Sequence, residues 1–418
     1  MLRHLFLWNN EWYNINVIFM KILLLILISF SLYGCKNIDK YRDEHFIMSN
    51  NQVEVYSDTH IYDLFSTKDI EVINKNELID TTKLGKHTYQ VSYKYENKKY
   101  TYDIEYEVVD TEAPRYFGGT YKTIKKNYDG DLCNLVLYGD NYDGDLDCTI
   151  KGEYNLGKEG TYKVIYVITD KSNNSTNIEV TLNVVSKIKS SNSTTPKKIE
   201  FADILRKYKT DETEVGIDVS KWQGNIDFTK VKEAGADFVM IRIGVQTKSG
   251  GEINIDPYYY QNIENAKNVG LKVGVYLYSI AINIEDAINQ ANWVINTLDK
   301  EKLDLPIVFD WENWSKWNNY KISFYDINNI ANTFLKTVED NGYKGMLYGS
   351  KYYLENIWTN KLEYPVWLAH YTKKTSYKGD YMMWQLSNTG KIDGINGDVD
   401  INILYKWKAK NEVYIFNK

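Results

Sequence analysis

The sequence predicts a multidomain protein in which two small all-β modules precede an α/β domain. Two observations indicate this architecture: a pair of similar segments with period-two alternation in the first half, and alternating strand and helix patterns after about residue 213. At 418 residues the chain is long enough for two or three domains, each with its own core. Its net charge of −6 is spread over 50 basic and 56 acidic residues, so the composition does not favour a nucleic-acid partner.

The N-terminal residues have the pattern of an export signal. Lys21 is followed by an apolar run of 11 residues and then by small residues, and this run is too short to span a bilayer as a permanent helix. We therefore expect residues 1–34 to be a signal peptide, with Met20 as an alternative start, and residues 35–47 to be a tether. The signal predicts an exported protein.

The letters LYGC at residues 32–35 resemble a bacterial lipobox. This resemblance implies that Cys35 is lipidated, becomes the first mature residue and anchors the protein to the outer face of the cytoplasmic membrane or the cell wall; secretion is the alternative. Two cysteines then remain, Cys133 and Cys148. They form either a disulfide in an oxidising compartment or two buried free thiols, and the sequence does not decide between these.

A repeat fills the region before residue 186. Segments 84–109 and 156–185 share a Leu-Gly-Lys turn, a Tyr-rich alternating strand, a polar turn and a second alternating strand. This pattern predicts antiparallel hairpins that build small sandwiches. With the DTEAP junction at 110–114, these segments resemble the bacterial immunoglobulin-like repeats of exported surface proteins, which places one module at 48–110 and another at 111–186.

Two polar features lie near the second module. Four acidic residues are close together in the sequence, and they suggest either calcium or, as we favour, ordinary acidic turns, because their spacing is not that of an EF-hand: Asp140, Asp143, Asp145 and Asp147. The Ser-, Thr- and Lys-rich stretch after residue 186 predicts a flexible linker at 187–210. Because this linker is too polar to carry a shared core, we expect the domain after it to fold by itself.

The domain at 211–411 has the signature of a parallel sheet covered by helices. Apolar runs predict strands at 237–243, 272–278, 305–310, 345–348 and 365–369. Helical apolar spacing fills the segments between them at 258–269, 285–298 and 325–340. Candidate polar residues follow several of the strands, at the carboxyl ends where barrel active sites form.

Two acids follow the apolar run that begins at residue 305. Alternate side chains of a strand share a face, so Asp310 and Glu312 project the same way and Trp311 points elsewhere. A neighbouring negative charge and partial burial raise a carboxyl pKa, so one acid of such a pair can keep its proton near neutral pH and donate it to a leaving group. The pattern thus predicts glycoside cleavage, although two acids one residue apart are also common in solvated loops.

Seven motifs along the domain resemble glycoside hydrolase family 25, the lysozyme-type muramidases of bacteria and their phages. They are GIDVSKWQGNIDF (216–228), VGVYLYS (273–279), FDWEN (309–313), YGSKYYL (348–354), VWLAHY (366–371), WQLS (384–387) and GDVDINI (397–403). The resemblance implies an irregular TIM-like (β/α) barrel. It also implies cleavage of the β-1,4 bond between N-acetylmuramic acid and N-acetylglucosamine in peptidoglycan.

The same resemblance assigns roles to individual residues. Glu312 matches the general acid, Asp310 its partner, Asp218 the acid of the first strand and Asp400 the late acid, for which Asp398 is a weaker candidate. The positions that line the sugar groove are Tyr276, Tyr348, Trp367, Tyr371 and Gln385. One departure is Leu277, where relatives often carry His.

Aromatic and metal-binding side chains complete the expected site. Trp faces stack on sugar rings, and we expect Trp367 and Trp384 to do so here. The domain contains a single histidine, His370, and no cysteine, so we expect neither a metal nor a cofactor and interpret His370 as a polar residue at a strand end.

The expected chemistry uses these acids in distinct roles. Glu312 supplies the proton, Asp310 orients and stabilises the substrate's N-acetyl group, and the charges of Asp218 and Asp400 keep Glu312 protonated. The retaining, inverting and substrate-assisted routes differ in the distance between the carboxyl groups, and the sequence does not give this distance, so all three remain open.

Two alternative functions also remain: a non-catalytic wall-binding lipoprotein, and a hydrolase of another N-acetylhexosamine polymer. The expected partners are peptidoglycan glycan strands and, through the lipid, a membrane.

Overall fold

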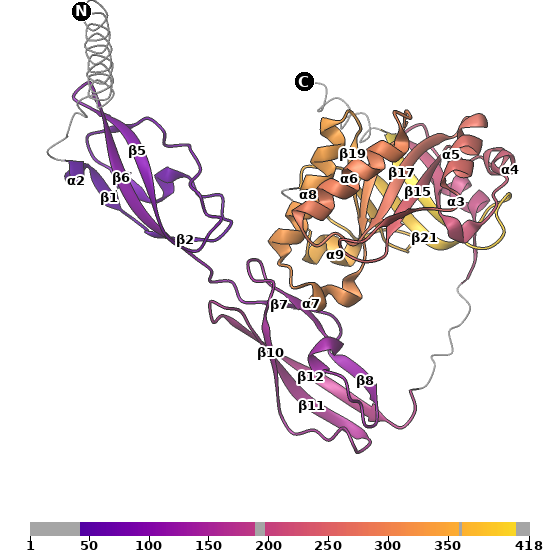
Figure 1. The fold of residues 1–418 in the computed structure, drawn as a ribbon, viewed down its shortest axis with the longest axis horizontal. Helices are drawn as coiled ribbons and strands as arrows, with labels where there is room; N and C mark the ends of the chain where they lie inside the picture. Colours follow the sequence, from indigo (N-terminus) through magenta and orange to yellow (C-terminus); the bar gives the residue numbers. More distant parts are fainter. Residues whose placement is uncertain (1–41, 189–196, 359–361, 407–418) are drawn as a thin grey trace, which may run out of the picture. The chain divides into compact units, whose positions relative to one another are not determined.

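A computed structural model describes residues 42–188, 197–358 and 362–406 (Figure 1). The chain divides into two compact units, residues 1–111 and 112–418. The expected signal peptide and Cys35 lie outside the described residues. Within the described part, none of the helices combines the length and the apolar character needed to cross a bilayer.

The first unit is built on a long antiparallel hairpin. Strands β5 (Gly85–Tyr95) and β6 (Lys98–Val109) pair along their whole length, as the alternating pattern at 84–109 predicts. Strand β4 (Glu71–Val72) extends the sheet beside β5, and β2 (Gln52–Glu54) extends it beside β6. A second, two-stranded sheet joins β1 (Phe46–Met48) and β3 (Phe65–Thr67). The short helices are α2 (Arg42–His45) and η1 (Ile61–Asp63).

The second β-module, residues 112–188, repeats this plan. Strands β11 (Gly160–Thr169) and β12 (Ser175–Val185) form the predicted hairpin, flanked by β10 (Asp147–Lys151) and β8 (Tyr121–Lys125). A smaller sheet pairs β7 (Arg115–Phe117) with β9 (Leu137–Gly139). A disulfide between Cys133 and Cys148 ties the helix η2 (Leu132–Leu135) to β10.

The rest of the second unit is a closed barrel of eight strands. In order they are β14 (Thr213–Val219), β15 (Phe238–Gln246), β17 (Lys272–Ser279), β18 (Ile307–Trp311), β19 (Gly345–Ser350), β20 (Val366–Ala369), β21 (Met383–Lys391) and β22 (Val399–Tyr405). Neighbours from β14 to β21 are parallel. The last strand, β22, is antiparallel to both β21 and β14, and these two pairings close the barrel. The barrel and its irregularity confirm the prediction.

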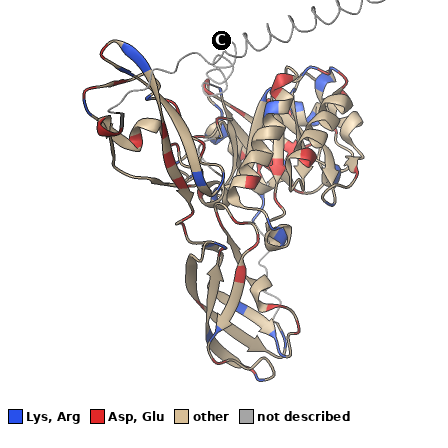
Figure 2. Cartoon of the chain, turned by 60° about the vertical axis from the view of Figure 1, so that its left-hand side comes forward, with Lys and Arg blue, Asp and Glu red and all other residues tan. Residues whose placement is uncertain are grey.

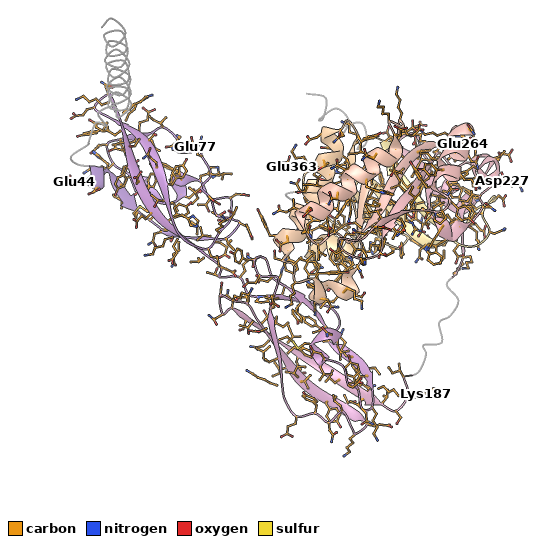
Figure 3. The ribbon with its side chains drawn as sticks, in the orientation of Figure 1. Glu44, Glu77, Lys187, Asp227, Glu264 and Glu363 are labelled. Carbon is orange, nitrogen blue, oxygen red and sulfur yellow. A yellow bond between two sulfur atoms is a disulfide. The ribbon has the colours of Figure 1, made fainter. Side chains whose placement is uncertain are left out.

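Helices cover the outside of the strands where connections are long. They are α4 (Phe228–Glu233), α5 (Tyr259–Asn268), α6 (Ile284–Leu298), α8 (Phe324–Asp340) and α9 (Lys351–Asn356), with α7 (Trp317–Tyr320), η3 (Lys221–Gln223), η4 (Trp314–Lys316) and strand β16 (Ile253–Ile255) in the loops. Asp227, labelled in Figure 3, caps α4, because its carboxylate accepts from Lys230 N. Ser323 and Asp326 form a capping box at the start of α8. Local sequence thus defines where these helices begin.

Two apolar cores result from the closed barrel. The outer core lies between strands and helices and includes Val239, Ile241 and Phe334. The inner core fills the barrel with side chains such as Met240, Val308 and Met346. Because both faces of the parallel strands are buried, these strands are continuous apolar runs.

Part of the expected linker belongs to the barrel. Strand β13 (Ile199–Glu200) pairs with β21, and helix α3 (Phe201–Tyr208) buries Phe201 and Ile204. These two apolar residues are three positions apart and share one helix face, but charged neighbours surround them in the sequence. Figure 2 shows basic and acidic residues interspersed over the described parts of the chain.

Candidate active site

A polar cavity opens at the carboxyl ends of the barrel strands. Its volume is about 250 Å³. The side chains that line it come from most of the strands: Asp218, Ser220, Trp222, Gln223, Arg242, Tyr276, Tyr278, Asp310, Glu312, Tyr348, Trp367, Tyr371, Gln385 and Asp400. All four acids singled out in the sequence therefore meet in one place, although Asp218 and Asp400 are 182 residues apart in the chain.

Strand β18 brings in the two central acids. Asp310 is 4% exposed and lines the cavity, whereas Trp311 is fully buried in the outer core. Glu312 follows the strand directly and is exposed at the cavity mouth. The alternation along β18 thus places both carboxyls on the cavity side, with Asp310 behind Glu312.

Burial and the repulsion between neighbouring carboxylates raise the pKa values of Asp310 and Glu312. Burial, followed by the charges of Glu312 and Asp218, holds the pKa of Asp310 well above its ordinary value. Desolvation of the Glu312 carboxyl, whose surroundings are the cavity walls although the residue reaches the mouth, also raises its pKa; a hydrogen bond with Asp310 opposes the rise, and the charge of Asp218 adds to it. A hydrogen bond joins the two carboxyls, so the pair can share a proton at neutral pH. This arrangement can deliver an acidic proton to a group that enters the mouth.

Asp218 is held from two sides on the barrel floor. Its Oδ2 accepts from Gln385 Nε2 at 2.9 Å and from Asn402 Nδ2 at 2.8 Å. Burial raises the pKa of Asp218 to about 6, and these two hydrogen bonds oppose that rise. Asp400 is its register partner across the β14–β22 pair. Burial and the charges of Asp218 and Glu312 raise the pKa of Asp400 to about 9.

Aromatic residues form the walls around the acids. Tyr348 and Trp367 are nearly buried, and their rings meet edge to face at 5.0 Å. Tyr276 packs on the same tryptophan at 6.0 Å. Tyr371 is 52% exposed and stands at the rim. The hydroxyls of Tyr348 and Tyr371 donate to Gln385 Oε1 at 2.9 and 3.0 Å, so one amide joins three of the five predicted groove residues.

Trp384 requires a correction. It is 3% exposed, does not line the cavity and packs in the outer core, where its Nε1 donates to His370 O at 2.9 Å. The reason is strand alternation: Gln385 faces the barrel interior, so its neighbour Trp384 faces outward. Its ring meets Tyr208 of α3 at 6.0 Å. Trp384 is therefore a packing residue.

Three other predicted positions lie away from the acids. Leu277 is fully buried in the outer core, so the change from His does not touch the cavity. Asp398 is half-exposed and pairs with Lys198 and Lys391. His370 Nδ1 lies 2.8 Å from Thr375 Oγ1, outside the cavity lining.

Sequence reasoning missed several residues that line the cavity. Arg242 is the only charged residue in its apolar strand, and its guanidinium forms a buried ion pair with Asp256 at 2.7 Å. Tyr278 is two residues beyond Tyr276 and therefore on the same face. Trp222 is 75% exposed at the rim. Two sequence signals could have found them: the isolated charge in an apolar strand points to Arg242, and the strand period of two points to Tyr278.

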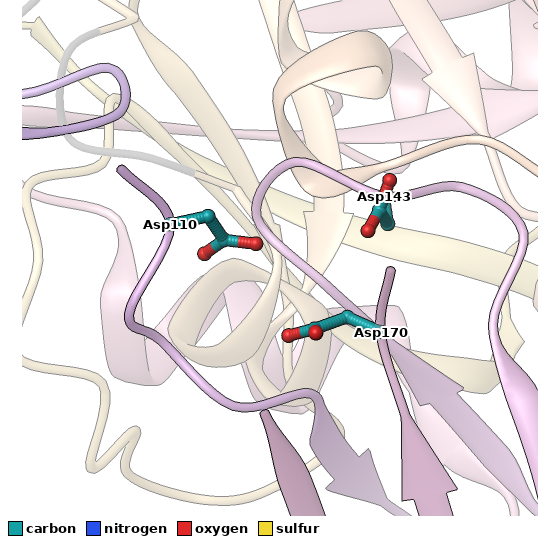
Figure 4. Close-up of side chains that lie close together, drawn as sticks. All are labelled: Asp110, Asp143 and Asp170. Carbon is teal, nitrogen blue, oxygen red and sulfur yellow. The ribbon is translucent and has the colours of Figure 1, made fainter. Parts of the chain in front are cut away.

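Two acids of the second β-module, Asp143 and Asp170, accept hydrogen bonds from backbone nitrogens. Figure 4 labels these two residues together with Asp110. Asp143 Oδ2 accepts from Lys171 N at 2.8 Å, and Asp170 Oδ1 accepts from Asn174 N at 2.8 Å. These bonds shape turns, which is the role favoured for acidic residues in this region.

A larger cavity of about 710 Å³ lies at the opposite end of the barrel. The residues that precede β18, β19 and β20 line it, including Pro306, Lys344 and Pro365. Barrel active sites form at the carboxyl ends of strands, and the acids converge there. Chemistry therefore places the active site in the smaller cavity.

A closed α/β barrel with a proton-sharing carboxyl pair at the carboxyl ends of its strands defines a glycoside hydrolase. The family model described as Glycosyl hydrolases family 25 matches residues 217–395. The uncharacterised protein YegX of Escherichia coli O157:H7 is 32% identical over 207 residues, which cover 48% of this chain and 72% of YegX. The chain therefore belongs to glycosyl hydrolases family 25.

Two further proteins are similar to this chain. The autolytic lysozyme of Clostridium acetobutylicum is 28% identical over 189 residues, which cover 45% of this chain and 54% of that protein. The structure of a family 25 glycosyl hydrolase from Bacillus anthracis is 24% identical, with a TM-score of 0.42. The match covers 49% of this chain and 95% of that one.

Proposed function

We propose that this protein is a muramidase that cuts the β-1,4 bond between N-acetylmuramic acid and N-acetylglucosamine in peptidoglycan. The observation that carries the proposal is the meeting of Asp218, Asp310, Glu312 and Asp400 in one cavity of a family 25 barrel. The similarity to an autolytic lysozyme supports the choice of substrate.

The geometry suggests how the work is divided. Glu312 is exposed at the mouth, where it can reach the glycosidic oxygen and donate a proton. Asp310 lies behind it and stabilises the positive charge that develops on the sugar or its N-acetyl group. Asp218 adds negative potential that favours retention of the proton by the pair. Asp400, whose pKa is raised to about 9, keeps its own proton at neutral pH.

The size of the cavity limits what it can hold. Ligand pockets usually begin at about 300 Å³, so a cavity of about 250 Å³ accommodates a sugar at the scissile bond rather than a longer oligosaccharide. Neighbouring sugars of the glycan strand then lie on the surface, beside the exposed rims of Trp222 and Tyr371.

Display at the cell surface is the second part of the proposal. The signal at 1–34 and the lipobox-like Cys35 support export and anchoring, with the β-modules as immunoglobulin-like spacers. The disulfide between Cys133 and Cys148 fits an oxidising compartment. We propose that the anchored enzyme acts on peptidoglycan from the outer face of the membrane.

The test is digestion of purified peptidoglycan with the chain lacking residues 1–34, followed by reduction and identification of the new reducing ends. Muramic acid at the new ends supports the proposal. Glucosamine at the ends would assign a different bond. No new ends, with retained binding to the wall, would favour the non-catalytic alternative; cleavage of chitin but not of peptidoglycan would favour another N-acetylhexosamine polymer.

A further inference from the structure

The second β-module packs against the barrel. Its strands β7 and β9, and the loop that follows β9, contact α7 and the start of α8, and Figure 1 shows β7 beside α7. Both parts belong to the same compact unit, residues 112–418. Phe117 of the module is 3% exposed and is a member of the barrel's outer core. The expectation that the two parts share no core is therefore wrong.

Hydrogen bonds fix the orientation of the second β-module against the helices α7 and α8. The first N–H groups of a helix have no partner within the helix. In α8, Phe324 N donates to Asp140 O at 2.8 Å, and Tyr325 N donates to Asn141 O at 3.4 Å. Asn318 Nδ2 of α7 donates to Val136 O at 2.9 Å. The module thus supplies acceptors that the barrel's own helix lacks.

The loop that offers these acceptors is held in shape by Asp140. The Oδ1 of this residue accepts from the backbone nitrogens of Tyr142 and Asp143, at 2.9 and 2.8 Å. Such a turn fixes the direction of the carbonyl groups beside it. The nearby ion pair between Lys321 and Asp145, at 3.0 Å, is exposed and contributes little.

Close approach of the two surfaces depends on glycine. A Cβ on Gly139 would lie 2.7 Å from Phe324 Cε1 and 3.0 Å from Trp317 Nε1. A Cβ on Gly144 would lie 2.1 Å from Lys321 O. Phe117 fills the space beside them, with ring centroids 6.3 Å from Trp317 and 5.9 Å from Phe324.

This interface is two rings away from the catalytic pair. Trp317 contacts Phe117 on one side and, on the other, Trp311, at a ring distance of 6.0 Å. Trp311 is the residue between Asp310 and Glu312, and its Nε1 donates to Ala281 O at 2.9 Å. The segment from Trp311 to Phe324, which includes Glu312, therefore runs from the barrel strand to the module.

We propose that the second β-module is a positioning element of the active site, which holds the segment 312–324 and through it the orientation of Glu312. Phe117, Gly139 and Asp140 are its positioning residues. The kinetic test of this inference rests on the proposed hydrolysis, because it measures kcat. The structural test, co-elution of the two parts, requires no substrate.

The first test replaces Gly139 by Val in the whole chain lacking residues 1–34. Gly119→Val in the same module is the matched control, because a Cβ there meets no atom within 4 Å. We expect Gly139→Val to lower kcat by about 10-fold to 100-fold with KM unchanged, measured where circular dichroism shows a folded chain, since small misplacements of a catalytic group have effects of this size. Gly119→Val should match the parent chain.

A milder pair of variants separates positioning from folding. Phe117→Leu keeps an apolar contact with Trp317, and Phe117→Ala removes it. We expect the leucine variant to recover most of the kcat lost in the alanine variant. The alkaline limb of the pH profile should also move in the alanine variant, because the environment of the Asp310–Glu312 pair changes.

The second test places a protease site within residues 189–196 and cuts the folded chain there. We expect the two pieces to co-elute in gel filtration and to keep their activity, because the interface holds them together. Separation of the pieces with unchanged kcat would overturn the proposal, as would wild-type kcat in Gly139→Val. If the parent chain cleaves no peptidoglycan, co-elution still tests the interface, so failure of the proposed function is distinguishable.

Discussion

Gln385 ties Asp218 to the aromatic wall of the active site. Its Nε2 donates to Asp218 Oδ2 at 2.9 Å, while its Oε1 accepts from the hydroxyls of Tyr348 and Tyr371. The ionised carboxylate of Asp218 can only accept a hydrogen bond, so it selects the NH₂ group of the amide and leaves the amide oxygen to accept from the two tyrosine hydroxyls. The amide therefore turns its donor to the carboxylate.

This relationship predicts a shift in pH dependence. The bonds from Gln385 and Asn402 lower the pKa of Asp218 against burial, which raises it to about 6. Gln385→Leu should raise this pKa further by about one unit, the size expected for a lost bond to a charged group. The acidic limb of kcat/KM should then move to higher pH. Gln261→Leu, on the exposed side of α5, should leave the limb in place, and an unmoved limb in both variants would contradict the role of Asp218 as an ionised group.

Glu312→Gln should abolish hydrolysis and leave the fold intact, because the amide keeps the shape of the side chain but cannot donate the proton. We expect a loss in kcat of at least 10²-fold to 10⁴-fold, the range typical of general acid catalysis. The assay is release of reducing ends from purified peptidoglycan. Glu264→Gln, an exposed change on α5, is the control. Activity above about a tenth of the wild-type value in Glu312→Gln would refute the assignment.

Asp400→Asn should stabilise the barrel at alkaline pH. The folded pKa of Asp400 is raised to about 9, above an unfolded value of about 3.9, so the folded chain binds the extra proton and loses stability as pH rises through this window. At pH 9 the melting temperature of the variant should exceed that of the wild type, by about 2 to 4 °C for each kcal/mol gained in unfolding free energy. At pH 4 the two melting temperatures should be nearly equal. Thermal unfolding followed by circular dichroism measures this. A variant that melts lower at pH 9 would contradict the burial of the charge.

Cys133→Ala with Cys148→Ala should destabilise the second β-module. The bridge closes a loop with a sequence separation of 15, for which the chain-entropy model gives about 3 kcal/mol. Because the module caps α8, we expect the barrel to melt earlier as well, in calorimetry without reductant. Addition of reductant to the wild-type chain should reproduce the effect. Barrel melting that is insensitive to both changes would show that the two parts unfold independently.

Cys35→Ala should release the protein from membranes. A single acyl chain anchors weakly, so the diacyl or triacyl form of bacterial lipoproteins is required for stable retention. The variant should appear in the medium or as unprocessed precursor, measured by fractionation and immunoblotting. An unchanged distribution would mean that the lipobox interpretation is incorrect.

The sequence predicted those parts of the fold that local pattern determines. Continuous apolar runs gave the strands from β15 to β20, and the spacing around Asp310 and Glu312 gave the catalytic face, because period two is a property of the backbone. Trp384 was assigned to the substrate because its chemistry suits a sugar, and only its register with Gln385 shows that it faces outward.

Long-range contacts were beyond such reasoning. The polarity of the expected linker at 187–210 carries no information about Phe117 and Gly139, which contact barrel residues about 200 positions later in the chain. Likewise, helix α3 was hidden because only Phe201 and Ile204 of its short sequence are buried. Residues that fit against a distant part of the chain, such as Phe117 and Gly139, follow no periodic pattern in the sequence that would identify them.

The pairing of β14 with β22 also sets the order in which the enzyme becomes active. Asp218 is on the first strand of the barrel to leave the ribosome and Asp400 is on the last, yet the two are register partners. Until β22 inserts antiparallel between β21 and β14, Asp218 also lacks the hydrogen bond from Asn402. A chain whose barrel has not yet closed therefore has no assembled active site, and it gains hydrolytic activity only as the last step of folding.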